Sequence, residues 1–344
     1  MSKKINLKSL SKDELFRFIE DRGLPRYRAD QLIHWIYKRY AAKIDGITEF
    51  SIDLRNVLNE ITFISNLELV KRLKSLDGTE KFLFSLEDGQ TIESVLIPDK
   101  SLRIRRITLC ISSQAGCAMG CSFCLTGRIG LIRNLKSYEI VDQIIAVNRI
   151  IKPERITNIV LMGMGEPLAN FDNVVEALWR VVLFIGISKR RITLSTAGIT
   201  PKILLLPKKA PEVNLAISLN ATTDVSRNEI MPVNKKYPLK SLINACKRYP
   251  LQPGRKITFE YVLIDGKNDS AEDAHRLVDL LRDLRCKINL IPLNPHAGSS
   301  LKRTSDQNVL EFQKILLQNN MRALIRESKG QDILAACGQL KAMY

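Results

Sequence analysis

The chain has 344 residues, of which 45% are hydrophobic and 26% are charged. These are globular proportions, so they exclude a disordered protein and allow a sizeable core in one large domain with an appendage or in two domains. The 53 lysines and arginines exceed the 36 aspartates and glutamates, giving a net charge of +17. This excess favours a polyanionic partner, nucleic acid above all, over a basic surface kept only for solubility.

The sequence also bears on location. Its apolar runs, such as 181–185, are far shorter than the roughly 20 residues that a membrane helix needs, and the first residues lack the apolar core of a signal peptide. We therefore expect a cytoplasmic protein without membrane association. The basic residues occur in small clusters and not in one tail, namely Arg103, Arg105 and Arg106; Lys189, Arg190 and Arg191; Lys235 and Lys236; Arg322 and Arg326.

The first sixty residues are predicted to form helices. Ser11 and Glu14 make a capping-box pattern, and Gly23 ends the helix that follows. A second helix is predicted near 29–40, and its apolar stripe is assigned to the core because of its helical spacing. Residues 1–62 are therefore assigned to an N-terminal helical accessory domain. The stripe consists of Leu32, Trp35, Ile36 and Tyr40.

Short β-rich runs follow between 67 and 97. They are divided by Asp77-Gly78 and Asp88-Gly89, dipeptides that supply the positive φ angles of tight hairpin turns. We predict a small antiparallel meander over residues 63–98.

The rest of the chain, residues 99–344, alternates buried strands with helices. Parallel strands need helices on their outer face, so this rhythm predicts an α/β fold, a partial (β/α)6 TIM-like barrel, with a doubly wound open sheet as the alternative. The predicted helices lie near 137–150, 170–184, 239–248, 270–284 and 304–319. The predicted strands are 107–111, 156–162, 192–195, 213–219, 257–264 and 288–293.

Three of the seven cysteines form a CxxxCxxC loop, placed by this prediction directly after the first strand of the βα series. Gly116 and Gly120 allow the tight folding that lets the three thiolates, Cys117, Cys121 and Cys124, face one centre. Thiolates hold iron–sulfur clusters, and a four-iron cluster with three protein ligands leaves one iron open to an outside ligand.

Zinc is the main alternative for these cysteines. Structural zinc needs four ligands, commonly from paired CxxC motifs, and the sequence has no second pair. The three histidines, His34, His275 and His296, are each more typical of surface or core positions than of ligands. Cys246 and Cys286 match no motif and are interpreted as core or surface thiols.

On these cysteines the sequence resembles the radical S-adenosylmethionine (SAM) superfamily. Cys110 and the tail from Ala335 through Cys337 to Leu340 make it similar to the RlmN/Cfr family of RNA adenine methyltransferases, from the helical start to the last residues. Similar superfamily segments lie where predicted strands end, and that rim of a barrel is where active sites form. They are Gly163-Met164-Gly165-Glu166-Pro167, Ser195-Thr196-Ala197-Gly198, Ser218-Leu219-Asn220 and Asn294-Pro295.

The resemblance implies a set of cofactors and ligands. A 4Fe-4S cluster is held by Cys117, Cys121 and Cys124, and two SAM molecules are used per turnover. The amino group of SAM is held by Gly165 and Glu166. Its other polar atoms are bound by Ser195, Ser218, Leu219, Asn220 and Asn294. Turn formation alone is the plainer interpretation of these residue types.

The resemblance also implies a two-thiol reaction. One SAM methylates Cys337, a 5′-deoxyadenosyl radical from the second takes hydrogen from that methyl group, and the carbon radical adds to adenine. Cys110 then attacks the Cys337 sulfur, leaving a disulfide, and Glu93 accepts the proton. From the residues alone, small core thiols and an edge-strand charge are the alternatives. The strand pattern places Cys110 with Thr108, opposite the apolar face of 107, 109 and 111.

The implied substrate is carbon 2 of an adenine in the peptidyl-transferase region of 23S ribosomal RNA and, in one branch, the adenine beside the anticodon of certain tRNAs. Residues 1–62 would bind RNA, and a flavodoxin-like donor would supply electrons to a monomer. The other branch, acting on carbon 8 and conferring antibiotic resistance, is not separated by Leu125-Thr126-Gly127. A zinc-containing RNA-binding module remains the non-enzymatic alternative. The stretch from Pro98 to Cys110 is longer than the family leads us to expect.

Overall fold

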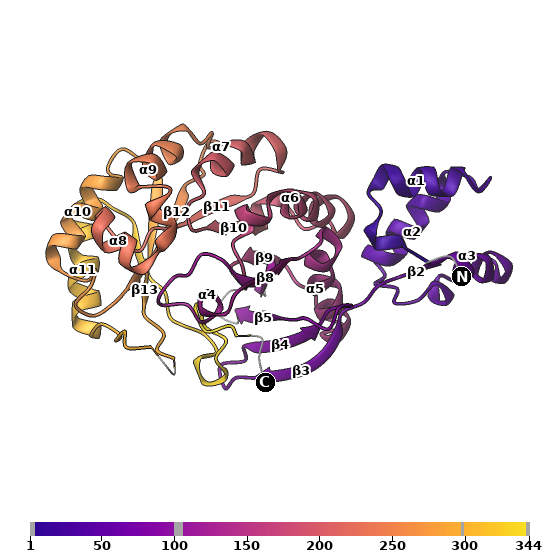
Figure 1. The fold of residues 1–344 in the computed structure, drawn as a ribbon, viewed down its shortest axis with the longest axis horizontal. Coiled ribbons are helices and arrows are strands. Elements are labelled where there is room, and N and C mark those ends of the chain that lie inside the picture. The colour runs from indigo at the N-terminus through magenta and orange to yellow at the C-terminus, as the bar shows by residue number, and fades with distance from the viewer. Residues whose placement is uncertain (1–3, 100–105, 297–298, 342–344) are drawn as a thin grey trace.

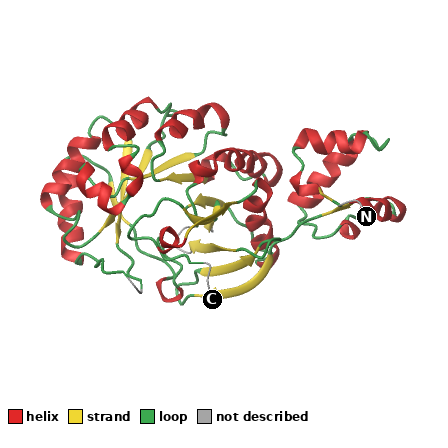
Figure 2. Ribbon diagram, viewed as in Figure 1, coloured by secondary structure: helices red, strands yellow, loops and turns green. Residues whose placement is uncertain are grey.

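The computed structural model describes residues 4–99, 106–296 and 299–341. Arg103 and Arg105 of the predicted basic clusters lie outside these ranges. A curved sheet has helices on its outer face, and the N-terminal helices form a lobe beside α5 (Ser137–Ile150) and α6 (Phe171–Arg180) (Figures 1 and 2).

The N-terminal lobe contains three helices and one pair of short parallel strands, β1 (Ile5–Asn6) and β2 (Thr62–Phe63). The predicted capping box is present, because Ser11 Oγ accepts from Glu14 N at 3.3 Å and the Glu14 carboxylate accepts from Ser11 N at 2.7 Å. The second helix ends before Tyr40, which is half-buried, as Trp35 is, whereas Leu32 and Ile36 are buried. The helices are α1 (Lys12–Glu20), α2 (Tyr27–Tyr37) and α3 (Ile52–Ile61).

The meander forms as predicted from its two Asp-Gly turns. Gly78 and Gly89 have φ angles of +87° and +80°, which a residue with a side chain rarely adopts. The third strand pairs antiparallel with β6 (Arg106–Cys110), so the meander extends the main sheet. Its strands are β3 (Glu68–Lys74), β4 (Glu80–Ser85) and β5 (Thr91–Asp99).

The parallel part of the sheet confirms the barrel prediction. Its order, β6-β9-β10-β11-β12-β13-β14, adds each new strand at the same edge, whereas a doubly wound sheet reverses direction at a switch point. The six predicted strands are present, and β14 is a short seventh that the sequence did not predict. After β6 they are β9 (Asn158–Leu161), β10 (Ile192–Thr196), β11 (Asn214–Ser218), β12 (Ile257–Leu263), β13 (Cys286–Pro292) and β14 (Ala323–Ile325).

Helices connect these strands. Three of them, α4, α7 and α8, were not predicted. The helices are α4 (Leu125–Ile129), α5 (Ser137–Ile150), α6 (Phe171–Arg180), α7 (Thr200–Lys209), α8 (Asp224–Ile230), α9 (Leu239–Arg248), α10 (Ala271–Leu281) and α11 (Asp306–Gln318). Within the described ranges, no helix is long and apolar enough to cross a membrane.

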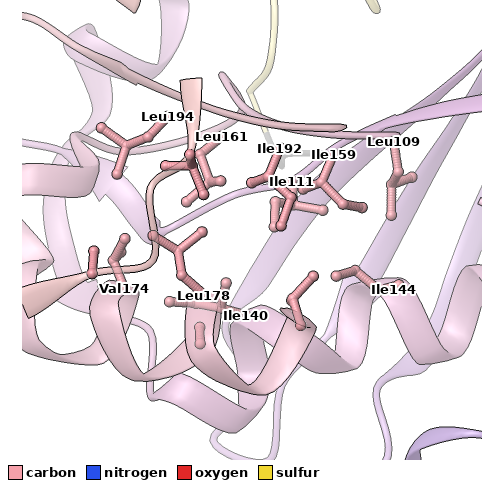
Figure 3. Packing of buried hydrophobic residues seen from close by; sticks show 14 of the residues in the cluster. Leu109, Ile111, Ile140, Ile144, Ile159, Leu161, Val174, Leu178, Ile192 and Leu194 are labelled. Carbon is pink, nitrogen blue, oxygen red and sulfur yellow. The ribbon is translucent and has the colours of Figure 1, made fainter. Parts of the chain in front are cut away.

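The core lies between the sheet and its outer helices. In Figure 3, Leu109 and Ile159 of the strands face Ile140 and Ile144 of α5, all of them buried. Burying a side chain of this size contributes roughly 1.5–3 kcal/mol. Because neighbouring strand residues point to opposite faces, Cys110 lies on the other, inner face, in a separate small cluster.

Candidate active site

The cysteine loop lies at the carboxyl ends of the strands, but it does not follow the first strand directly as predicted. The strand β7 (Gln114–Cys117) lies between β6 and the loop, and it pairs antiparallel with β8 (Gly130–Asn134), which follows the loop. Cys117 is the last residue of β7, and Cys124 immediately precedes α4. The β7 sequence lacks apolar alternation, so the sequence offered no strand signal there.

Two glycines fold this loop tightly, for the reason given from the sequence. Gly116 has a φ of +74°, and a Cβ there would collide with the carbonyl oxygen of Gly130 across the hairpin. Gly120 has a φ of +63°. Cys124 N donates to Cys121 O at 3.1 Å, which closes the turn between the second and third cysteines.

The three thiols lie close enough to influence one another. Burial raises the pKa of Cys117 to about 12 and raises that of Cys121, and repulsion from the neighbouring thiolates adds to both shifts. Among the described residues, no three His, Cys, Asp or Glu side chains meet as a site for a single metal ion. An iron–sulfur cluster does not require such a meeting, because each cysteine binds a different iron. The donor set therefore fits a cluster held by Cys117, Cys121 and Cys124.

Glu166, in the loop after β9, is buried beside this cysteine loop. Its carboxylate accepts from Thr196 Oγ1 at 2.7 Å, Ala197 N at 2.6 Å and Leu168 N at 3.0 Å. Burial raises the pKa of Glu166, while these hydrogen bonds act in the opposite direction. Gly165 has a φ of +99°, and a Cβ there would lie 2.5 Å from the Cβ of Gln114. Glu166 thus ties the loop after β9 to the end of β10, and Gly165 lets that loop pack closely against Gln114.

The other predicted SAM-binding residues lie at the ends of β10 and β11 or just beyond. Ser195 is buried and Ser218 is half-buried. Leu219 is fully buried, and its N–H donates to Glu260 O at 3.0 Å. Asn220 has a φ of +58°, and its side chain accepts from Val262 N at 2.9 Å and donates to Met231 Sδ at 3.2 Å. Its side chain therefore supports the loop.

The segment 330–341, called here the C-terminal loop, passes over the cysteine loop. Leu125 N donates to Gly338 O at 2.7 Å, and Thr126 Oγ1 donates to Leu340 O at 2.7 Å. A Cβ on Gly338 would lie 3.1 Å from Phe123 O. Asn294, predicted to bind SAM, donates through Nδ2 to Cys337 O at 3.2 Å. These contacts place Cys337 next to the cysteine loop.

The structure brings Cys110 and Cys337 together from opposite ends of the barrel sequence. Cys110 is buried with Ala335 and Leu340, which flank Cys337. Burial raises the pKa of Cys110, and the nearby Cys337 adds to this shift. The side chain of Cys337 is exposed, yet the surrounding protein desolvates its thiol and, with Glu260, raises its pKa to about 11. Both thiols are free. Cys246 and Cys286, in contrast, are buried in the main core.

Glu93 is buried on β5 and faces the same loop. Its Oε1 lies 3.1 Å from Lys81 Nζ, and its Oε2 accepts from Lys341 N at 2.8 Å. Lys81 also donates to Leu334 O at 3.1 Å. Lys81 was missed from the sequence, although the Asp88-Gly89 turn sets a register in which Lys81 lies diagonally across from Glu93 on the same face.

A partial barrel with three loop cysteines at its carboxyl rim, next to a buried acidic strand end, defines a radical SAM enzyme. Residues 111–281 match the radical SAM superfamily, and residues 5–64 match the ribosomal RNA large subunit methyltransferase N-terminal domain.

Similar proteins cover the whole chain. The dual-specificity RNA methyltransferase RlmN of Pelobacter propionicus is 48% identical over 99% of this chain and 97% of its own length. That of Geobacter sulfurreducens is 50% identical over 99% and 93%. A crystal structure of a radical SAM methyltransferase from Sphaerobacter thermophilus has a TM-score of 0.93 at 42% identity, covering 98% of this chain and 100% of that one. The chain belongs to the RlmN family of radical SAM RNA methyltransferases, enzymes that use SAM and an iron–sulfur cluster.

Proposed function

We propose that this enzyme methylates carbon 2 of a specific adenine in the peptidyl-transferase region of 23S ribosomal RNA and of the adenine next to the anticodon in certain tRNAs. The observation that carries the proposal is the meeting of Cys110 and the residues flanking Cys337 in one small cluster, next to the CxxxCxxC loop. A methyltransferase that only positioned SAM against a nucleophile would need neither thiol.

The cofactors are one 4Fe-4S cluster on Cys117, Cys121 and Cys124, and two SAM molecules per turnover. When bound, they supply a methyl group and a radical strong enough to take hydrogen from a methyl group. Gly165 and Glu166 are proposed to orient SAM, together with Ser195, Ser218, Leu219, Asn220 and Asn294. The position of Glu166 beside Cys117 and Cys121 supports this assignment.

The two thiols have different roles in the reaction. Cys337, exposed and close to the cysteine loop, carries the methyl group and then the covalent bond to adenine. Cys110, buried beside it, attacks the Cys337 sulfur as the thiolate, so that the sulfur–carbon bond breaks, a disulfide forms, and the released carbon takes up a proton to become the methyl group on adenine. Glu93 accepts the proton that leaves carbon 2, and its carboxylate lies 3.1 Å from Lys81 Nζ.

The partners follow from this chemistry. The base must be extruded from folded RNA into the barrel, and residues 1–62 would hold the RNA. A reducing donor of the flavodoxin type would supply electrons to a monomeric enzyme in the cytoplasm, where ribosomes and tRNAs are found.

Mass spectrometry of nucleosides tests the proposal. RNA from cells with and without the protein is digested and separated, and the isolated 23S and tRNA fractions are compared. We expect 2-methyladenosine in both fractions only when the protein is present. 8-Methyladenosine would instead establish the carbon-8 branch, and no methylated adenine would refute the proposal.

A further inference from the structure

A cavity of about 540 Å³ lies between the N-terminal lobe and the barrel, away from the active site. Its wall from the lobe includes Lys38, Arg39 and Tyr40, and its wall from the barrel includes Arg155 and Arg191. Arg155 and Arg191 come shortly before β9 and β10, so this cavity lies at the amino ends of the strands. The cysteine loop and Cys337 lie at the carboxyl ends.

The lining of this cavity carries positive charge and contains no Asp or Glu. Arg39, Arg155 and Arg191 are exposed, and within the described part of the chain none of the three makes an ion pair. Three unpaired guanidinium groups around one hollow repel one another and raise the local positive potential. A bound anion relieves this repulsion.

Both walls are held in place by hydrogen bonds between lobe and barrel. Lys38 Nζ donates to Ile185 O at 2.8 Å. Arg149 donates to Tyr40 O at 2.7 Å and to Ala41 O at 2.9 Å. Tyr40 itself has a φ of +61°, a conformation that persists in a non-glycine residue only where its surroundings enforce it. The backbone segments that carry the charged side chains are therefore fixed relative to one another.

We propose that this cavity binds phosphate groups of the RNA backbone, at a second contact remote from the target adenine. The inference rests on the proposed function, which makes RNA the substrate. Guanidinium groups bind phosphate with two parallel hydrogen bonds. A site for a small phosphate compound would enclose most of its ligand, whereas these arginines stay exposed, as suits a polymer lying across the hollow.

The test uses the full-length, anaerobically reconstituted enzyme with Arg39→Gln, Arg155→Gln and Arg191→Gln combined. RNA affinity is measured across a range of salt concentrations, because each phosphate contact adds to the slope of log K against log salt. The slope should fall by about one for each arginine that contacts a phosphate. The triple Arg→Lys variant should keep most of the slope.

A matched control removes three exposed positive charges from α7 and α9 on another part of the barrel, in Lys208→Gln, Lys240→Gln and Arg248→Gln. Equal slopes for the two triple variants, or a wild-type slope in the cavity variant, would overturn the proposal. Calorimetric titration with inorganic phosphate tests whether the cavity instead binds free phosphate. The proposal would also be overturned if the wild type bound phosphate, the cavity variant lost this binding, and the RNA salt slope of the variant stayed unchanged.

Two further measurements distinguish a failure of this proposal from a failure of the proposed function. Thermal unfolding should be the same for both triple variants, which shows that they fold. At saturating RNA the cavity variant should methylate at the wild-type rate. If wild-type enzyme makes no methylated adenine while the salt slope falls as expected, the proposed function fails and the phosphate site stands.

Discussion

The two ends of the chain are attached to the barrel in different ways. The N-terminal lobe is held by buried charges: Lys8 Nζ lies 2.5 Å from Asp142 Oδ1, and both side chains are almost fully buried. Arg180 of α6 donates to Lys8 O at 2.6 Å and Leu10 O at 3.0 Å. The C-terminal loop is held instead by hydrogen bonds, to α4, Asn294, Lys81 and Glu93 and to the Asp77-Gly78 turn. Ser75 Oγ donates to Asp332 at 2.6 Å, and Gly330 N donates to Asp77 at 3.0 Å.

This difference suits the two proposed tasks. Buried ion pairs cost several kcal/mol to break, so the lobe keeps a fixed position from which to hold RNA. The C-terminal loop must deliver Cys337 to a cofactor, a base and a second thiol in turn. It contains three left-handed positions, Gly330, Leu334 and Gly338, with φ angles of +64°, +52° and +84°.

Replacing a thiol should have the largest effect. Cys110→Ala should abolish turnover and leave the enzyme covalently joined to its RNA, because the Cys337 sulfur can no longer be attacked. Denaturing gel electrophoresis detects the adduct. The double variant Cys110→Ala, Cys337→Ala should form none, and normal turnover by the single variant would show that the two-thiol scheme is wrong.

The second largest effect is expected from breaking the buried ion pair between Lys8 and Asp142. Lys8→Met leaves the Asp142 charge buried without its partner, which should lower the free energy of unfolding by about 3–5 kcal/mol in urea titrations. Replacing both residues, in Lys8→Met with Asp142→Leu, should restore most of the stability. A single variant as stable as the wild type would contradict the view that the lobe is fixed by this pair.

A smaller effect is expected where the C-terminal loop is tethered. Ser75→Ala removes the hydrogen bond to Asp332, and the loss of one such bond should increase the open fraction of the loop roughly two- to tenfold. Hydrogen exchange of residues 330–341 should speed up while the urea midpoint stays unchanged. Ser85→Ala, at the end of β4 beside the other turn of the meander, is the control. A lower urea midpoint without faster exchange of residues 330–341 would contradict the view that this loop opens locally while the lobe stays fixed.

The smallest effect concerns pH. Partial burial acts to raise the pKa of Asp77, but hydrogen bonds from Thr79 and Gly330 lower it to about 2. Because the folded pKa is below the unfolded value of about 3.9, the contribution of Asp77 is complete above that value and is lost as the pH falls towards 2. The gap in melting temperature between wild type and Asp77→Asn should therefore narrow over this range. If the difference in melting temperature stayed constant over this range, the ionised Asp77 would not contribute to holding the C-terminal loop.

Much of the fold could be predicted because periodicity and turn chemistry are local. The six long strands, the two Asp-Gly turns and the inner position of Cys110 all follow from residues near one another in the chain. The β7–β8 hairpin and the three-residue β14 carry no such pattern. Helix α7 was missed although Pro201 occupies its first turn, where proline is favoured. The division into 1–62, 63–98 and 99–344 stays a prediction.

The site was less predictable, because its contacts join distant segments. The cysteine loop could be read from spacing, but the nearness of Cys110 to Cys337 came from family resemblance. The bonds of Glu166 to Thr196 and of Asn294 to Cys337 depend on how the strand ends meet. The same holds for Asn220, a proposed SAM ligand whose side chain supports its own loop. The roles of all these residues remain predictions.

The most direct test is made in one anaerobic reaction. Reconstituted enzyme, SAM, dithionite and unmodified RNA are incubated together, and 5′-deoxyadenosine and 2-methyladenosine are quantified by mass spectrometry. Both products should accumulate, and Cys337→Ala should yield no 2-methyladenosine. If the wild-type protein, with its cluster intact, produced neither compound, radical methylation by this chain would be contradicted.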